Sequence, residues 1–174
     1  IYIASLTPKS VKQSGEIADG IFPIHWPKEQ FASLRTELQE GANLVDSNKS
    51  LTIAPQTRLV ILDGEDDESK WIQSKKLVHY YINRMGTFYW QALSRNGFEE
   101  EVQASRKAWE DRNIDKSISA ITNEMIESIQ IIGTIDEIKE KFDQRSELGA
   151  DLQLIQMPPG DIETTKKILN KILG

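Results

Sequence analysis

Short apolar runs alternate along the chain with longer segments in which apolar residues recur every three or four positions. The short runs have the composition of buried strands, and the longer segments have the periodicity of amphipathic helices. We therefore expect strands and helices to alternate, with parallel strands joined by right-handed crossovers. The expected strands cover residues 1–4, 21–24, 51–64 and 151–158, with an irregularity at Pro55.

The first expected helix covers residues 8–18 and turns Val11, Gly15 and Ala18 inward. A glycine inside a helix costs about 1 kcal/mol relative to alanine. We therefore expect another backbone segment to approach Gly15 closely. A second helix is expected to begin at Pro27 and to end near Gly41.

The alternation stops between residues 66 and 128, where the pattern predicts helices only. Breaks are expected at Gly86, at Asn96-Gly97 and around Asn113. Aromatic residues crowd the apolar faces of these helices, and such stripes usually form core or a subunit interface. We interpret residues 66–128 as a helical insertion within one domain that covers residues 1–174, and we expect part of it to form a dimer contact.

Beyond the insertion, Thr134 and Glu137 have the spacing of a capping box at the start of a helix. An amphipathic helix is expected to close the chain. Four strands, each followed by helix, fit either a small open sheet or half of an eight-stranded (β/α) barrel. In a barrel the chemistry lies beyond the carboxyl ends of the strands. In this chain those ends are followed by Ser5-Leu6-Thr7, His25-Trp26, Asp63-Gly64 and residues 157–160.

The composition of the chain argues against several classes of protein and of functional site. The net charge of −6 and the pI near 5.1 argue against a nucleic-acid coat protein. The absence of cysteine excludes a disulfide scaffold, a thiolate metal site and a cysteine nucleophile, and it fits a reducing cytoplasm. No apolar run is long enough to cross a membrane. No metal-ligand spacing, paired carboxylates or Ser-His-Asp arrangement indicates a metal site or a catalytic residue.

The start of the Pro8 helix carries Lys9 and Lys12 and no acid before Glu16. Acids are normally favoured there, because the free N–H groups make a helix start partly positive. Thr7 suits the N-cap and Pro8 suits the first helical position. The pattern indicates a site kept for an external anion. The alternative is that Thr7 and Pro8 only cap the helix and that the lysines are solvated.

Two stretches resemble one known family. The stretch "IYIASLTPKSVKQSGEIADGI" resembles the strand, Gly-Pro-Lys, helix and Ala-Asp-Gly segment of the bacterial luciferase-like oxidoreductases. It is most similar to the branch of methylene-tetrahydromethanopterin reductase and other coenzyme F-420-dependent enzymes. The stretch "IIGTIDEIKEKFDQRSELGADLQLIQMPPGD" resembles that family's Gly-Thr-Pro-Glu-Glu helix and last barrel strand. Thr7 departs from the family's frequent glycine, Ser10 from methionine and Ile135 from proline.

The resemblance implies a (β/α)8 TIM barrel of the bacterial luciferase-like type, of which this chain is the C-terminal half. Family members are roughly twice as long, and the chain begins inside a strand-like run without an initiator methionine. We therefore expect an N-terminal half from the same gene product, from a companion chain or from a second copy. Residues 1–174 alone are not expected to form a stable, active monomer.

The resemblance also implies hydride transfer between a deazaflavin, coenzyme F-420, and a small organic substrate. FMN is the alternative cofactor, and an FMN-dependent monooxygenase or a non-catalytic, flavin-binding or structural relative is the alternative function. Family members contact the cofactor phosphate through the loop after the strand that corresponds to residues 1–4. His25 could touch the cofactor ring or the substrate, or be an ordinary polar residue, and Trp26 could wall the pocket or serve packing. The cofactor-binding prediction comprises Ser5, Leu6, Thr7, Pro8, Lys9, His25 and Trp26.

Overall fold

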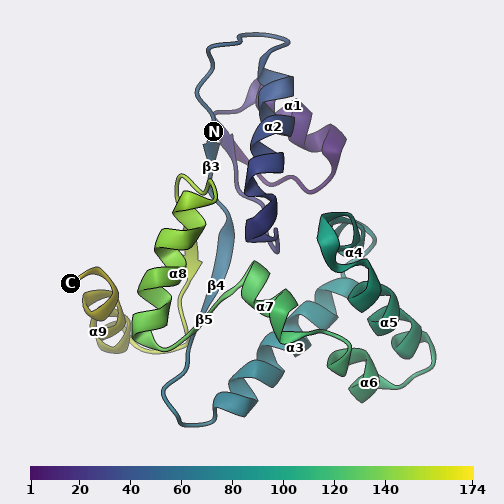
Figure 1. Cartoon of the computed structure of the whole chain (residues 1–174), viewed down its shortest axis with the longest axis vertical. Coiled ribbons are helices and arrows are strands. Elements are labelled where there is room, and N and C mark those ends of the chain that lie inside the picture. The colour runs from purple at the N-terminus through teal and green to yellow at the C-terminus, as the bar shows by residue number, and fades with distance from the viewer.

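The computed structural model describes residues 1–174, and Figure 1 shows that its helices gather in groups around a few central strands. The strands are β1 (Tyr2–Ile3), β2 (Gly20–Ile21), β3 (Thr52–Ile53), β4 (Gln56–Ile61), β5 (Ile131–Gly133) and β6 (Leu154–Gln156). The helices are α1 (Pro8–Ile17), α2 (Phe31–Ala42), α3 (Asp67–Arg84), α4 (Phe88–Leu93), α5 (Glu99–Glu110), α6 (Ile114–Ser119), α7 (Asn123–Ile129), α8 (Ile135–Glu147) and α9 (Ile162–Leu173). Two short non-α turns, η1 (Lys28–Gln30) and η2 (Ser94–Phe98), precede α2 and α5.

All strand pairs are parallel, so the expected α/β class with a parallel arrangement is confirmed. The strands form two sheets with the orders β1-β2-β3 and β5-β4-β6, and a bridge between Ile24 and Gln56 connects them. β3 and β4 follow each other directly and are separated only around Pro55, which has no N–H to donate. The irregularity expected at Pro55 is therefore present.

The observed strands are shorter than the sequence predicts: the expected strands 1–4 and 151–158 are reduced to β1 and β6, and the expected strand 51–64 is divided into β3 and β4. The second expected strand, residues 21–24, is reduced to β2 and the single bridge at Ile24. β5 was not expected at all, because three residues carry too little periodicity to separate a strand from the end of a helix. It forms because Leu59, Val60 and Ile61 of β4 offer it a pairing edge.

Glycine brings α1 and α2 into close contact. A Cβ atom added at Gly15 would lie 2.0 Å from the carbonyl oxygen of Leu38, and one added at Gly41 would lie 1.9 Å from that of Lys12. The close approach expected at Gly15 is confirmed. The two helices cover β2 and β3 through a hydrophobic cluster that includes Val11, Ile21 and Ile53.

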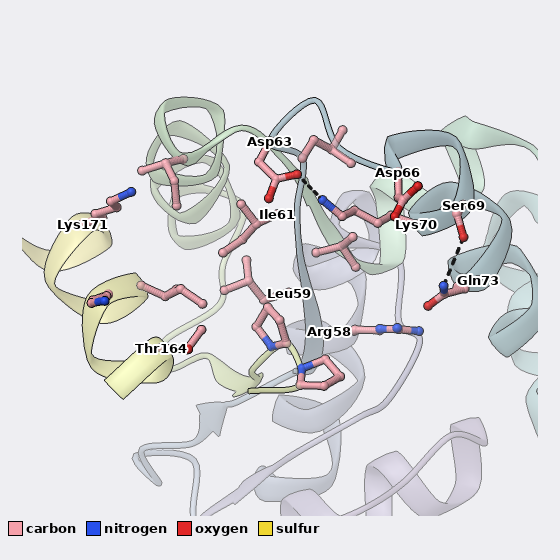
Figure 2. A pocket seen from close by; sticks show the side chains of 17 residues that line it. Arg58, Leu59, Ile61, Asp63, Asp66, Ser69, Lys70, Gln73, Thr164 and Lys171 are labelled. Carbon is pink, nitrogen blue, oxygen red and sulfur yellow. Dashed lines mark hydrogen bonds and ion pairs between the residues drawn. The ribbon is translucent and has the colours of Figure 1, made fainter. Parts of the chain in front are cut away.

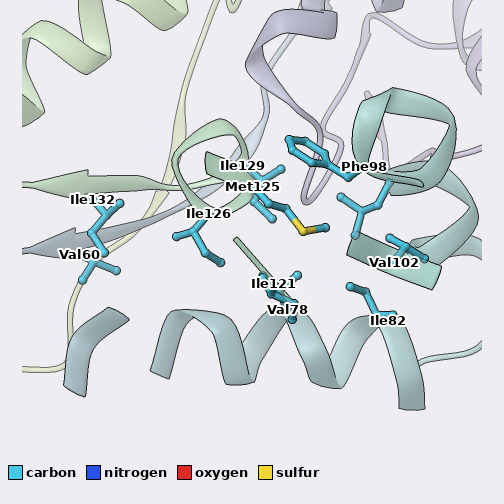
Figure 3. Close-up of a cluster of buried hydrophobic side chains, with 11 residues drawn as sticks. Val60, Val78, Ile82, Phe98, Val102, Ile121, Met125, Ile126, Ile129 and Ile132 are labelled. Atoms are coloured by element: carbon cyan, nitrogen blue, oxygen red, sulfur yellow. The ribbon is translucent and has the colours of Figure 1, made fainter. Parts of the chain in front are cut away.

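The segment between residues 66 and 128 is helical, as expected, and its breaks fall at the predicted places. Gly86 and Gly97 have positive φ values of 83° and 107°, which glycine adopts without the steric cost of a Cβ atom. Figure 3 shows how its side chains, among them Val78, Val102 and Met125, pack together and reach Val60 of β4. The insertion is thereby fixed to the strands.

Helices α8 and α9 cover β4 and β5 through Leu59, Ile131 and Ile138. The capping box expected at Thr134 and Glu137 is present at the start of α8. No helix of the chain combines the length and apolar composition needed to span a membrane.

Candidate cofactor-binding site

The start of α1 follows β1 and has the expected cap. The Ser10 N–H donates to the Thr7 hydroxyl over 3.2 Å, and the Thr7 N–H donates to the Ser10 hydroxyl over 3.2 Å. Pro8 has no N–H, and the first turn contains no acid. The N–H groups of Leu6 and Lys9 donate no hydrogen bond within the chain. The helix start therefore presents unused donors and the exposed Lys9 side chain to an anion.

Ser5 holds this loop to the helix. Its hydroxyl is buried and lies 2.8 Å from the hydroxyl of Ser14, which itself donates to the Ser10 carbonyl oxygen. The Leu6 side chain is half-buried and packs on the cluster beneath α1 and α2. Both residues thus position the backbone of the loop.

The helical insertion adds a cation that sequence reasoning missed. Arg95 donates from Nη2 to the carbonyl oxygen of Leu6 over 2.7 Å, and the Glu37 carboxylate interacts electrostatically with it without forming an ion pair. The residues are 89 positions apart in the sequence. The sequence indicated only that a helix is interrupted at Asn96-Gly97, next to Arg95. Such an interruption does not show which distant loop the Arg95 side chain will contact.

His25 follows β2 in an unusual environment. Its φ is +52°, in the left-handed region that few residues other than glycine, asparagine, aspartate and histidine adopt. The side chain is 7% exposed, and Nε2 is buried without a hydrogen-bond partner. Burial lowers the pKa of His25 to about 4, so the imidazole is neutral at pH 7.

Two tyrosines of the insertion complete the surroundings of His25. The Tyr81 ring lies edge to face against His25, with centroids 4.4 Å apart, and against Tyr89, with centroids 4.8 Å apart. Neither tyrosine was among the predicted site residues. The aromatic stripe was visible in the sequence, but it indicated core or interface. The structure therefore brings one predicted residue together with two unpredicted ones.

Trp26 lies elsewhere. Its side chain is buried in the cluster with Phe31 and Leu34, and Nε1 donates to the Gln30 carbonyl oxygen over a long 3.4 Å. Although Trp26 follows His25 in the sequence, its contacts are those of a residue that packs in the core.

A cavity of about 800 Å³ lies apart from these residues, between β4, α3 and α9 (Figure 2). None of the sequence-predicted site residues lines it, although Asp63 and Pro158, which follow strands, do. Lys70 binds Asp63, and this hydrogen bond lowers the pKa of the Asp63 carboxyl. Histidine and acidic side chains nowhere form a cluster of three that could hold a metal ion.

Known proteins resemble this chain over nearly its whole length. It is 25% identical over 160 residues to 5,10-methylenetetrahydromethanopterin reductase of Methanopyrus kandleri, a match that covers 91% of this chain and 45% of that protein. The structure of the coenzyme F-420-dependent tetrahydromethanopterin reductase of Methanopyrus kandleri superimposes with a TM-score of 0.69 at 20% identity, over 97% of this chain and 48% of that one.

A further structure with the same fold is that of an F-420-dependent secondary alcohol dehydrogenase in complex with an F-420–acetone adduct. Its TM-score is 0.61 at 12% identity, over 98% of this chain and 47% of that one. The chain thus spans about half the length of the proteins that it matches. The sequence profile of the luciferase-like monooxygenases matches residues 1–152, and the chain therefore belongs to the luciferase-like monooxygenase family.

Proposed function

We propose that this chain is the C-terminal half of a (β/α)8 barrel oxidoreductase that moves hydride between coenzyme F-420 and a small organic substrate. FMN is the alternative cofactor. Family membership supports an oxidoreductase, and the named relatives that depend on F-420 favour the deazaflavin. The main observation in favour of a bound cofactor is the loop from Leu6 to Lys9. Its backbone N–H groups of Leu6 and Lys9 have no acceptor within the chain, and the cations Lys9 and Arg95 lie beside them.

The half-barrel proposal is supported by the end strands of the two sheets. β1 and β3 each pair only with β2, and β5 and β6 each pair only with β4, whereas every strand of a closed barrel has two neighbours. Of these, β1 and β6 are the first and last strands of the chain, where a second half would have to join. Tyr2 on β1 is 39% exposed and Leu154 on β6 is 41% exposed. An N-terminal half, from the same gene product or a companion chain, would pair both edges and cover these side chains. A soluble monomer of residues 1–174 that unfolds cooperatively and oxidises or reduces F-420 would contradict this proposal.

The residues at the start of α1 fit a cofactor phosphate. The N–H groups of Leu6 and Lys9 would donate to its oxygens, and Lys9 and Arg95 would supply positive charge. The first turn of α1 contains no acid, so no carboxylate there would repel the phosphate. The bound deazaflavin or flavin would itself supply the hydride chemistry, and the chain would bind and orient it.

His25 fits a position beside the cofactor ring or the substrate. Its neutral imidazole adds no charge, and the chain leaves the buried Nε2 without a hydrogen-bond partner. The edge-to-face contact with Tyr81 limits the freedom of the imidazole ring. We assign His25 the role of a polar contact and Trp26 the role of a support beneath the same loop.

Cofactor titration tests the proposal. The chain, co-expressed with its N-terminal half where one is found, is titrated with F-420 and separately with FMN while cofactor fluorescence is followed. Saturable binding of F-420 that is tighter than that of FMN supports the deazaflavin. Tighter FMN binding supports the alternative cofactor. Binding without substrate turnover points to a non-catalytic flavin-binding relative, and no binding of either cofactor overturns the proposal.

A further inference from the structure

The cavity between β4, α3 and α9 is more cationic than the chain that surrounds it. Only two acids, Asp63 and Asp66, line the cavity, and the lining contains more cations than acids. The whole chain, in contrast, carries a net charge of −6. Lys70 is neutralised by Asp63 and Asp67. The cations of the lining are Arg58, Lys70, Lys167 and Lys171.

Arg58 is the least expected of these cations. It lies on β4, between the two neighbouring strands, and is half-buried. Its guanidinium group makes no hydrogen bond or ion pair within the chain, and burial lowers its pKa. A guanidinium group withdrawn from water is normally compensated by an acceptor or an anion. Figure 2 shows its side chain running toward Gln73 of α3, whose amide bonds the Ser69 hydroxyl over 3.3 Å.

Helix α9 forms the opposite wall. Thr164, Lys167 and Lys171 are spaced to lie on one face of this helix, and neither lysine has an ion-pair partner. Ile168 and Ile172 fix α9 against the cluster around Leu59. The lysines therefore belong to a helix that is packed on the strands.

The cavity also has apolar surface between these two walls, from Leu59, Ile61 and Pro158. Ligand sites commonly combine an apolar surface with a few polar groups that fix orientation. A purely inorganic ion would leave this surface uncovered. The lining therefore suits an organic molecule with an apolar body and an anionic group.

We propose that this cavity binds an organic anion, with a phosphate or carboxylate group held by Arg58 and with its apolar part on Leu59 and Ile61. Lys167 and Lys171 supply further positive potential from the other wall. Arg and carboxylate or phosphate can form two parallel hydrogen bonds, which makes arginine suited to this role. The proposal is independent of the cofactor site at α1, because none of those residues lines this cavity.

Calorimetric titration of the chain, co-expressed with its N-terminal half where one is found, with phenyl phosphate and with benzoate tests the site and separates the two anionic groups. We expect saturable binding of at least one probe and a loss of about tenfold or more in Arg58→Gln, equivalent to about 1.4 kcal/mol. Arg58→Lys should retain part of the affinity, and the Lys167→Gln/Lys171→Gln double variant should lose less than Arg58→Gln. Circular dichroism of each variant checks that it is folded.

Lys166→Gln is the matched control, because Lys166 lies on the same helix, pairs with Glu163 and does not line the cavity. It should bind the probes as the unchanged chain does. Absence of binding of both probes overturns the proposal. Equal affinity of folded Arg58→Gln and the unchanged chain, or an equal loss in Lys166→Gln, also overturns it. If Arg58→Gln does not fold, the outcome rests on Arg58→Lys and the double lysine variant, and unchanged affinity in both overturns it.

Discussion

His25 and Tyr81 meet edge to face, with ring centroids 4.4 Å apart and ring planes at 77°. This contact joins the loop after β2 to the helical insertion. The positive φ of His25 costs on the order of 1–3 kcal/mol, and such strain occurs preferentially at functional sites. The contact therefore helps to hold a strained residue, with a free ring nitrogen, at the carboxyl end of the strands.

The buried His25 should make stability depend on pH. The folded chain keeps it neutral down to about pH 4, whereas the unfolded chain protonates it near its ordinary pKa of about 6.5. The free energy of unfolding should thus be highest above about pH 6.5 and fall by up to about 3 kcal/mol as the pH drops toward 4. Urea unfolding at several pH values measures this.

His25→Asn isolates that contribution, because asparagine tolerates positive φ and does not titrate. The variant should lose most of the pH dependence between about pH 6.5 and 5, whereas carboxyls with lowered pKa values, among them Asp63 and Glu137, still lose stabilisation toward pH 4 in both chains. His79 also has a pKa lowered by burial, so a smaller slope should persist. Identical slopes in the variant and the unchanged chain would show that His25 is not held neutral.

Thr7→Asp should abolish binding at the proposed phosphate site without unfolding α1. Aspartate caps helices as well as threonine does, so the hydrogen bond to the Ser10 N–H is retained. Its carboxylate would repel a phosphate beside Leu6 and Lys9. We expect cofactor affinity to fall about tenfold or more, and Thr7→Ser, which keeps the cap without charge, to bind normally. Unchanged affinity in Thr7→Asp would place the phosphate elsewhere.

Gly15→Ala should destabilise the chain although alanine favours helix by about 1 kcal/mol. The added Cβ would lie 2.0 Å from the Leu38 carbonyl oxygen, so α1 and α2 must separate. We expect a net loss of about 2 kcal/mol in the free energy of unfolding. Gln13→Ala on the exposed face of α1 is the control and should change it by less than about 0.5 kcal/mol. A more stable Gly15→Ala chain would refute the close packing.

The insertion should form part of a dimer contact, because it leaves large apolar side chains in water. Phe88 is 60% exposed and Ile114 is 52% exposed. Light scattering at tens of micromolar should give the mass of a dimer, and Phe88→Asp should shift the mass toward that of a monomer. Lys76→Asp on the exposed face of α3 serves as a control for added negative charge. A monomeric mass for the unchanged chain would exclude this contact.

The sequence by itself determined the local structure. The cap at Thr7, the capping box at Thr134 and the break at Gly97 all follow from short-range stereochemistry. The alternation of apolar runs and helical periods likewise determined the α/β class with parallel strands. These features depend on neighbouring residues, and so they are readable from one sequence.

Only the tertiary structure decided which distant residues meet. Strand β5 forms because it pairs with the edge of β4. Arg95 donates a hydrogen bond to Leu6, 89 positions away in the sequence, and the Tyr81 ring packs edge to face against His25. The same holds for Arg58, whose unpaired state depends on every element around the cavity. Such contacts arise from the packing of whole elements, and neither periodicity nor spacing along the chain encodes them.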